Sequence, residues 1–262
     1  MSAAGVLLVA LLAQAPVSPP LVLPGYRLHL VVDESVEADD LRALAGSGTV
    51  LWLRTSSNTL RDSTVEALSL FSEAYIQLRP PLKEEQVRQL RRAPRVGAWL
   101  EAPMLEGAGL HWLGPRRTAV EIRGGLDSKL AQRLSALRPS RIIWSPGNSE
   151  VSLADWGVFA QLPGSKLLAL SGAPGPLCPE LPWRAALATV AVRVEEGTGA
   201  ESCTLSRRVI MKGLPEDAVL VALLGQESPT ELEVQVGPGA GELSRARAWV
   251  QRLEAAVRGG RR

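Results

Sequence analysis

Residues 28–54 read LHLVVDESVEADDLRALAGSGTVLWLR and contain the unit from which the fold is built. An apolar run begins at Leu28, a polar loop and a helix-like amphipathic stretch follow, and a second apolar run begins at Val50. Both runs have the length and the β-branched or aromatic composition of strands. A strand, a helix and a second strand in this order predict a parallel βαβ unit.

The same unit recurs along most of the chain. The spacing of its apolar runs is about 20 to 25 residues, the length of one strand, two short loops and one helix. The runs begin near Leu28, Val50, Tyr75, Val96, Thr118, Arg141, Lys166 and Thr189. Between runs, residues 60–71, 82–92 and 127–137 have the apolar face of a packing helix, and Asp127 or Ser128 is the expected cap of the last one.

Alternate positions of these runs have different compositions, and in a strand they point to opposite faces. One set is aliphatic, as a face covered by helices must be. It comprises Leu28, Leu30, Val32, Leu51, Leu53, Ile76, Leu78, Val96, Ala98, Leu100, Val120, Ile122, Leu168, Leu170, Val190, Val192 and Val194. The other set is mixed and turns polar toward the end of each run. It comprises His29, Val31, Asp33, Val50, Trp52, Arg54, Tyr75, Gln77, Arg79, Gly97, Trp99, Glu101, Ala119, Glu121, Arg123, Ile143, Ser145, Leu167, Ala169, Ser171, Ala191 and Arg193.

This difference favours closure of the sheet into a barrel. A barrel interior can change from packed core to polar mouth along its axis, whereas an open sheet covered by helices on both sides is apolar on both faces. We predict one α/β domain over residues 25–262, a (βα)8-barrel-like repeat, with an open parallel α/β sheet as the alternative. The chain resembles the (βα)8 barrel class in layout only, and that resemblance implies no particular activity.

The repeat fails after Val194. We expect residues 195–240 to form an irregular β appendage with short strands at 209–211, 219–224 and 232–236, followed by an amphipathic helix over 243–257. A second register stays open, in which 219–224 is the last barrel strand.

The first 24 residues differ from the rest. Small apolar residues end at Ala13-Gln14-Ala15, and a proline-rich linker follows, which is typical of a secretory signal peptide. No Lys or Arg precedes the apolar segment, so an uncleaved membrane anchor and a cytosolic protein with an apolar N-terminal arm stay open. We expect a periplasmic or secreted protein with no stable membrane span after signal removal.

Composition excludes some partners and sites. The net charge is +2, and the 29 basic and 27 acidic residues are scattered, which does not indicate nucleic-acid binding. His29 and His111 are the only histidines, so we expect no metal site and no cofactor; His29 is expected as a satisfied core or bottom-face residue. Cys178 and Cys203 are the only cysteines, and in an exported chain we expect a disulfide between them, with two unpaired thiols as the alternative.

Polar residues end every predicted inward face. They are Asp33, Arg54, Arg79, Glu101, Arg123, Ser145, Ser171 and Arg193. The C-terminal ends of the strands are where barrels of this kind carry their sites. Arginine presents a planar fork of donors suited to carboxylate, sulfate or phosphate. Trp52, Tyr75 and Trp99 lie deeper, as stacking surface or as the floor of a pocket.

Three functions are consistent with this ring. The leading one is binding of a small polar or anionic ligand, with a glycan among the candidates, by Arg54, Arg79, Arg123, Arg193, Ser145, Asn148 and Trp99. The second is a glycan hydrolase with Glu101 or Asp33 as acid or base. The third is a non-catalytic scaffold of the cell envelope whose ring charges pair with one another. Whether the protein is an enzyme, and its oligomeric state, are left open.

Overall fold

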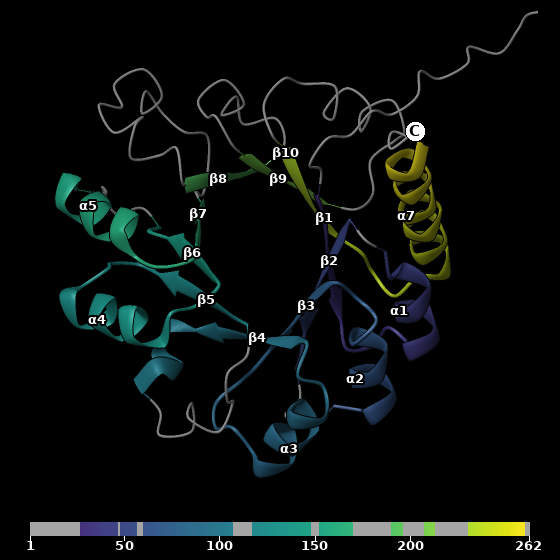
Figure 1. Ribbon diagram of the computed structural model, residues 1–262, viewed down its shortest axis with the longest axis horizontal. Helices are drawn as coiled ribbons and strands as arrows, with labels where there is room; N and C mark the ends of the chain where they lie inside the picture. Colours follow the sequence, from purple (N-terminus) through teal and green to yellow (C-terminus); the bar gives the residue numbers. More distant parts are fainter. Residues whose placement is uncertain are drawn as a thin grey trace, which may run out of the picture.

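The computed structural model describes residues 27–46, 48–56, 60–106, 117–147, 152–169, 190–195, 207–212 and 230–259. Within these ranges, ten strands are hydrogen-bonded side by side in a closed ring, and every neighbouring pair is parallel (Figure 1). The strands are β1 (Arg27–Asp33), β2 (Thr49–Arg54), β3 (Glu73–Gln77), β4 (Val96–Glu101), β5 (Thr118–Arg123), β6 (Arg141–Ser145), β7 (Ser165–Ala169), β8 (Val190–Glu195), β9 (Arg207–Lys212) and β10 (Thr230–Gln235).

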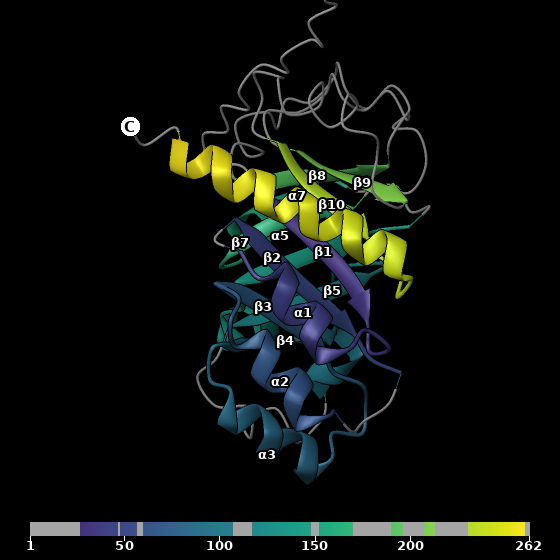
Figure 2. The same cartoon turned by 90° about the vertical axis from the view of Figure 1, so that its right-hand side faces the viewer.

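The described helices lie outside the ring of strands (Figure 1). They are α1 (Ala38–Leu44), α2 (Asp62–Leu68), α3 (Glu84–Arg92), the 3-10 helix η1 (Ala102–Glu106), α4 (Ser128–Leu137), α5 (Leu153–Gln161) and α7 (Ala240–Gly259). Figure 2 shows α7 lying across the outside of the sheet at β1 and β10, and Arg247 on α7 forms an ion pair with Asp40 on α1. Among the residues described, no helix combines the length and apolar character needed to cross a bilayer.

The predicted barrel-like α/β fold is confirmed, and its eight predicted strands correspond to β1 through β8. The expected β appendage is wrong for its first and last strands. β9 pairs with β8 and β10, and β10 pairs with β1, so both are strands of the barrel itself. The reason is physical: without β9 and β10, β1 and β8 would be open edges with unpaired backbone groups. The expected strand at 219–224 lies outside the described residues.

Two separate apolar clusters follow the predicted alternation. The larger one lies between strands and helices, where Leu30, Leu51 and Ile76 pack with Leu41 and Leu68 from α1 and α2. The smaller one fills the barrel interior. It consists of Val31, Val50, Trp52, Tyr75, Trp99, Ala119, Ile143, Leu167 and Ala169. The interior is therefore a packed apolar core. A few buried polar side chains adjoin it, among them His29, Gln77, Glu121 and Glu233.

An aromatic layer forms part of this interior core. The rings of Trp52 and Tyr75 are stacked with centroids 4.5 Å apart, and Trp99 meets Trp52 edge-on at 5.3 Å. Gly97 makes this packing geometrically feasible, since a Cβ there would lie 2.6 Å from Cδ1 of Tyr75. The rings of Trp52 and Tyr75 face each other and are buried, so they close the barrel interior beneath the C-terminal ends of the strands.

Helix-end signals behave as the sequence suggests. Asp127 is the N-cap of α4, and its Oδ1 accepts a hydrogen bond of 2.7 Å from the backbone N–H of Leu130. The same helix ends at Leu137, with Arg138 in the left-handed conformation at φ 50°. Ser152 and Asp155 form a reciprocal capping box at the start of α5.

Candidate functional site

The C-terminal rim of the barrel contains six of the predicted site residues. We use this name for Asp33, Arg54, Arg79, Glu101, Arg123 and Ser145, which stand at or just after the ends of β1 to β6. Arg193 is in β8, aligned with Ala169 on one side and Arg208 on the other, and its side chain is not described. Asn148, Ser171, Cys178 and Cys203 lie outside the described residues.

Two carboxylates and one guanidinium meet on β4 and β5. Glu101 and Glu121 are register partners on these neighbouring strands. Arg123 Nε donates to Glu121 Oε1 at 3.1 Å, and Arg123 Nη2 lies 3.9 Å from Glu101 Oε1. The negative charge of Glu121, its hydrogen bond and the charge of Glu101 raise the pKa of Arg123. The side chain of Glu121 is 10% exposed, that of Glu101 is 40% exposed and that of Arg123 is 68% exposed.

A second arginine is anchored next to β2 and β3. Arg79 Nε donates to the carbonyl oxygen of Thr55 at 2.5 Å, and Thr55 Oγ1 donates to the carbonyl oxygen of Gln77 at 2.8 Å. Thr55 is buried, whereas Arg79 is exposed. The backbone therefore holds the Arg79 guanidinium at Nε. Its two terminal amino groups form no hydrogen bond or ion pair with residues that the structure describes.

Asp33 and Arg54 stand on the neighbouring strands β1 and β2. Their backbones are register partners at the strand ends, and both residues are exposed. Asp33 Oδ1 accepts from the backbone N–H of Ser35 at 2.9 Å and from the Ser35 hydroxyl, which closes the turn after β1. Arg54 has no hydrogen bond or ion pair within the described part of the chain.

The two candidate acid or base residues, Asp33 and Glu101, do not meet at the rim. β2 and β3 stand between their strands in the ring, and Asp33 is bound to its own turn. The carboxylate beside Glu101 belongs to Glu121. Trp99 lies one inward position below Glu101 on β4 and is only 7% exposed, so it belongs to the floor under the rim.

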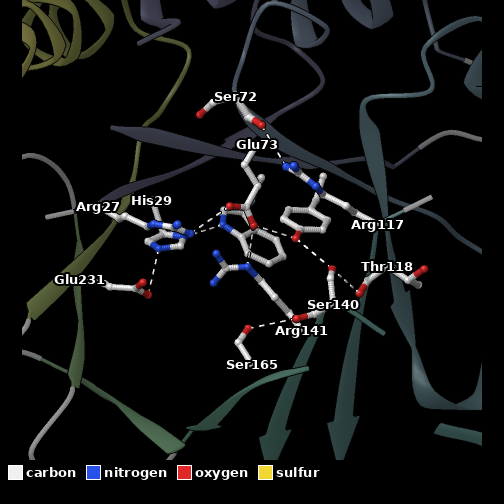
Figure 3. A network of polar contacts seen from close by, with 12 residues as sticks. Arg27, His29, Ser72, Glu73, Arg117, Thr118, Ser140, Arg141, Ser165 and Glu231 are labelled. Atoms are coloured by element: carbon white, nitrogen blue, oxygen red, sulfur yellow. Dashed lines mark hydrogen bonds and ion pairs between the residues drawn. The ribbon is translucent and has the colours of Figure 1, made fainter. Parts of the chain in front are cut away.

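The tightest polar network lies at the opposite, N-terminal end of the strands (Figure 3). Glu73 is at its centre: Oε1 accepts from Arg141 Nε at 2.7 Å, and Oε2 accepts from Arg27 Nη1 at 3.1 Å. The side chains of Glu73 and Arg141 are 14% and 11% exposed. The Tyr75 hydroxyl donates to Glu73 Oε1 at 2.8 Å and lies 3.2 Å from Ser140 Oγ.

The pKa directions in this N-terminal network follow from its pairing. Burial alone would raise the pKa of Glu73, but the hydrogen bond and charge of Arg141, the Tyr75 hydroxyl and the charge of Arg27 lower it overall. Burial would lower the pKa of Arg141, and the hydrogen bond and charge of Glu73 raise it. Burial raises the pKa of the Tyr75 phenol. Every one of these groups is thus held in its ordinary ionisation state at neutral pH, which suits a structural ion network.

His29 is satisfied inside the barrel, as the sequence predicts. Its Nδ1 accepts from the indole N–H of Trp52 at 3.0 Å, and its Nε2 lies 3.0 Å from Glu231 Oε2 (Figure 3). The residue is fully buried. Both ring nitrogens therefore have partners, and the histidine is part of the N-terminal end of the core.

Sequence reasoning missed the charges at the N-terminal end. They are Arg27, Glu73, Arg141, Glu231 and the buried Glu233 one inward position above Glu231. The signal was present in the alternation, because Arg27, Glu73 and Arg141 stand two residues before His29, Tyr75 and Ile143 and so share their inward face. Following the inward alternation back to the first residue of β1, β3 and β6 would have found these three charges.

The described residues contain no group of three or more His, Cys, Asp or Glu side chains arranged to hold a metal ion. The chain matches no protein-family model, and a search of the curated proteins gives no significant match. The two ends of the barrel differ in how their charged residues are held. At the N-terminal end the charges pair with one another, and Glu73 and Arg141 are nearly buried, while the C-terminal rim exposes guanidinium groups, two of which are held at Nε.

Proposed function

We propose that the protein binds a small polar ligand with an anionic group at the C-terminal rim. The observation that carries this proposal is the way two rim arginines are held. Arg123 is anchored through Nε to the nearly buried Glu121, and Arg79 is anchored through Nε to the Thr55 carbonyl. Anchoring at Nε fixes the plane of the guanidinium and leaves its outer amino groups for a ligand.

Pre-organisation is the physical advantage of this arrangement. An arginine that is already ordered loses less side-chain entropy when it binds an anion than one that is mobile in solvent. Arg54 supplies a third guanidinium at the same end of the barrel and has no partner among the described residues. Carboxylate, phosphate and sulfate groups are the chemistry that such forks recognise.

A second candidate function is hydrolysis, in line with the expected glycan-acting enzyme. The register pairing of Glu101 with Glu121 places two carboxyl-bearing side chains on adjacent strands, and Glu101 is the more exposed of the two. Glu101 is then the candidate acid or base, and Glu121, paired with Arg123, is the candidate for the ionised partner. Asp33 is a weaker candidate because it caps its own turn.

Export remains part of the proposal. Its support is the composition of residues 1–24, with a periplasmic or secreted location as the expected outcome and an uncleaved membrane anchor as the alternative.

The experiment that tests the binding proposal is calorimetric titration of the full chain with inorganic phosphate, sulfate and a panel of sugar acids. We expect Arg123→Gln and Arg54→Gln each to weaken the binding of the best ligand about tenfold, which is the loss of roughly one charge-assisted contact. Arg92→Gln is the matched control, because Arg92 pairs with Asp62 on the exposed outside of the barrel.

The outcomes separate the three functions. Unchanged ligand binding in Arg123→Gln and Arg54→Gln would contradict a binding site at the C-terminal rim. Loss of folding in Arg123→Gln, with no binding by the wild type, would favour the scaffold. Turnover of 4-nitrophenyl glycosides by the wild type and its loss in Glu101→Gln, with thermal stability retained, would favour the hydrolase.

A further inference from the structure

Two polar atoms just beneath the C-terminal rim have no hydrogen-bond partner in the described part of the chain. They are Nε1 of Trp99 and Oε1 of Gln77. The two residues are buried, at 7% and 5% exposed, and they are register partners on β4 and β3. Both belong to the inward face, so the two unsatisfied atoms lie in the same part of the barrel interior.

The orientation of the Gln77 amide is fixed by its neighbour. Its Nε2 lies 3.5 Å from Oε1 of Glu101, and a carboxylate accepts hydrogen bonds without donating them. The amide nitrogen must therefore face Glu101, and the carbonyl oxygen is the atom left without a donor. Rotating the amide would exchange one unsatisfied atom for a repulsive contact between two oxygens.

The indole of Trp99 has the opposite need. Its N–H can only donate. The edge-on contact with Trp52 occupies part of the ring without satisfying this donor, and the register partner on the other side, Ala119, has no polar side-chain atom. A donor and an acceptor are thus both unsatisfied on neighbouring strands, and buried polar groups in folded proteins are rarely left this way.

We infer that Trp99 and Gln77 form a hydroxyl subsite of the rim site, and that the ligand is a hydroxylated anion of the sugar-acid class. A hydroxyl group accepts from the indole N–H and donates to the amide oxygen at once. Glu101 stands one inward position above Trp99, so a ligand held at its anionic end by Arg79 or Arg123 reaches inward toward this pair. This inference depends on the proposed function.

The test compares anions that differ only in their hydroxyl groups. The probes are D-glucuronate, D-galacturonate and D-gluconate, with cyclohexanecarboxylate as a ring carboxylate without hydroxyls and inorganic phosphate as a bare anion. Titrations are followed by calorimetry and by the indole N–H resonances of protein labelled with ¹⁵N-tryptophan. The Trp99 resonance is assigned by its loss in Trp99→Phe.

We expect at least one sugar acid to bind the wild type about tenfold more tightly than cyclohexanecarboxylate and to shift the Trp99 indole proton downfield. Trp99→Phe and Gln77→Met should each remove most of that preference while cyclohexanecarboxylate binds as before. Gln86→Met on α3 is the matched control, because Gln86 is a buried glutamine outside the barrel whose amide atoms have no partner among the residues described.

The failures are distinguishable. Equal binding of hydroxylated and hydroxyl-free anions, or a sugar-acid preference that survives in both variants, overturns the subsite and leaves the anion site standing. Absence of binding by every anion, phosphate included, overturns the proposed function and the subsite with it. If Trp99→Phe does not fold, Gln77→Met decides: a sugar-acid preference that survives in Gln77→Met overturns the inference.

Discussion

The indole N–H of Trp52 donates to Nδ1 of His29 across 3.0 Å, which ties β2 to β1 inside the barrel. Because Nδ1 accepts this bond, the neutral imidazole carries its proton on Nε2, next to Glu231. A single donor from the aromatic layer therefore sets the tautomer of the one described histidine, and the barrel core is joined to its N-terminal network at this point.

Replacement of Trp52 by Phe should destabilise the protein by about 2–3 kcal/mol. The change removes part of a buried ring and leaves the fully buried Nδ1 of His29 without a donor. Trp249→Phe on α7 is the control, because Trp249 is also buried but forms no hydrogen bond through its indole with the described residues. Urea denaturation measures both variants, and equal losses would show that the His29 bond contributes nothing beyond ring area.

Replacement of Glu73 by Gln should cost about 2–4 kcal/mol of unfolding free energy. The nearly buried Arg141 keeps a hydrogen-bond acceptor but loses its counter-charge, and Arg27 nearby adds a second cation. Asp62→Asn breaks the exposed pair with Arg92 and should cost less than about 1 kcal/mol. Chemical denaturation at neutral pH compares the two. A loss in Glu73→Gln no larger than that in Asp62→Asn would contradict a structural role for the network.

The stability contributed by Glu73 should depend on pH in a defined direction. Its pKa is lowered in the folded protein, so folding favours the ionised form. The contribution is complete above the ordinary carboxyl pKa of the unfolded chain and is lost as the pH falls through the lowered folded pKa. The gap in unfolding free energy between wild type and Glu73→Gln should therefore narrow from pH 7 toward pH 3. A gap that stays constant over this range would show that Glu73 is not the titrating group.

Much of the fold was predictable because the chain repeats one unit. The alternation in β1 through β7 predicted which residues face the helices and which fill the barrel, and the two apolar clusters follow that division. Strands β9 and β10 were wrongly assigned to an appendage because no helix pattern between them was evident in the sequence. Only the closing of the ring, a property of all the strands together, shows that β1 and β8 need partners.

The site was predictable only in part, for a related reason. Alternation places Glu101 and Glu121 on the same face, but their meeting depends on the register between β4 and β5, which a single strand does not contain. The N-terminal network was missed because Glu73 and Arg141 begin their strands, where a polar residue in the sequence resembles the end of a loop. Their burial follows from the surrounding ring of strands.

Replacement of Gly97 by Ala tests whether the aromatic layer is as tightly packed as the geometry requires. The added Cβ would lie 2.6 Å from one carbon of the Tyr75 ring and 2.7 Å from another, and 3.0 Å from the Arg117 carbonyl oxygen. Tyr75 cannot retreat easily, because it stacks on Trp52 and its hydroxyl is bound to Glu73. We expect a loss of about 1–3 kcal/mol, the usual cost of overpacking a core.

The matched substitution is Gly157→Ala in α5, where an added Cβ meets nothing within 4 Å. Alanine is the better helix former, so this variant should be neutral or more stable by up to about 1 kcal/mol. The midpoints of thermal unfolding should therefore move in opposite directions, down for Gly97→Ala and level or up for Gly157→Ala. If Gly97→Ala unfolds at the wild-type temperature, the Tyr75 ring has room to move, and the interior beneath the rim is less closely packed than its contacts imply.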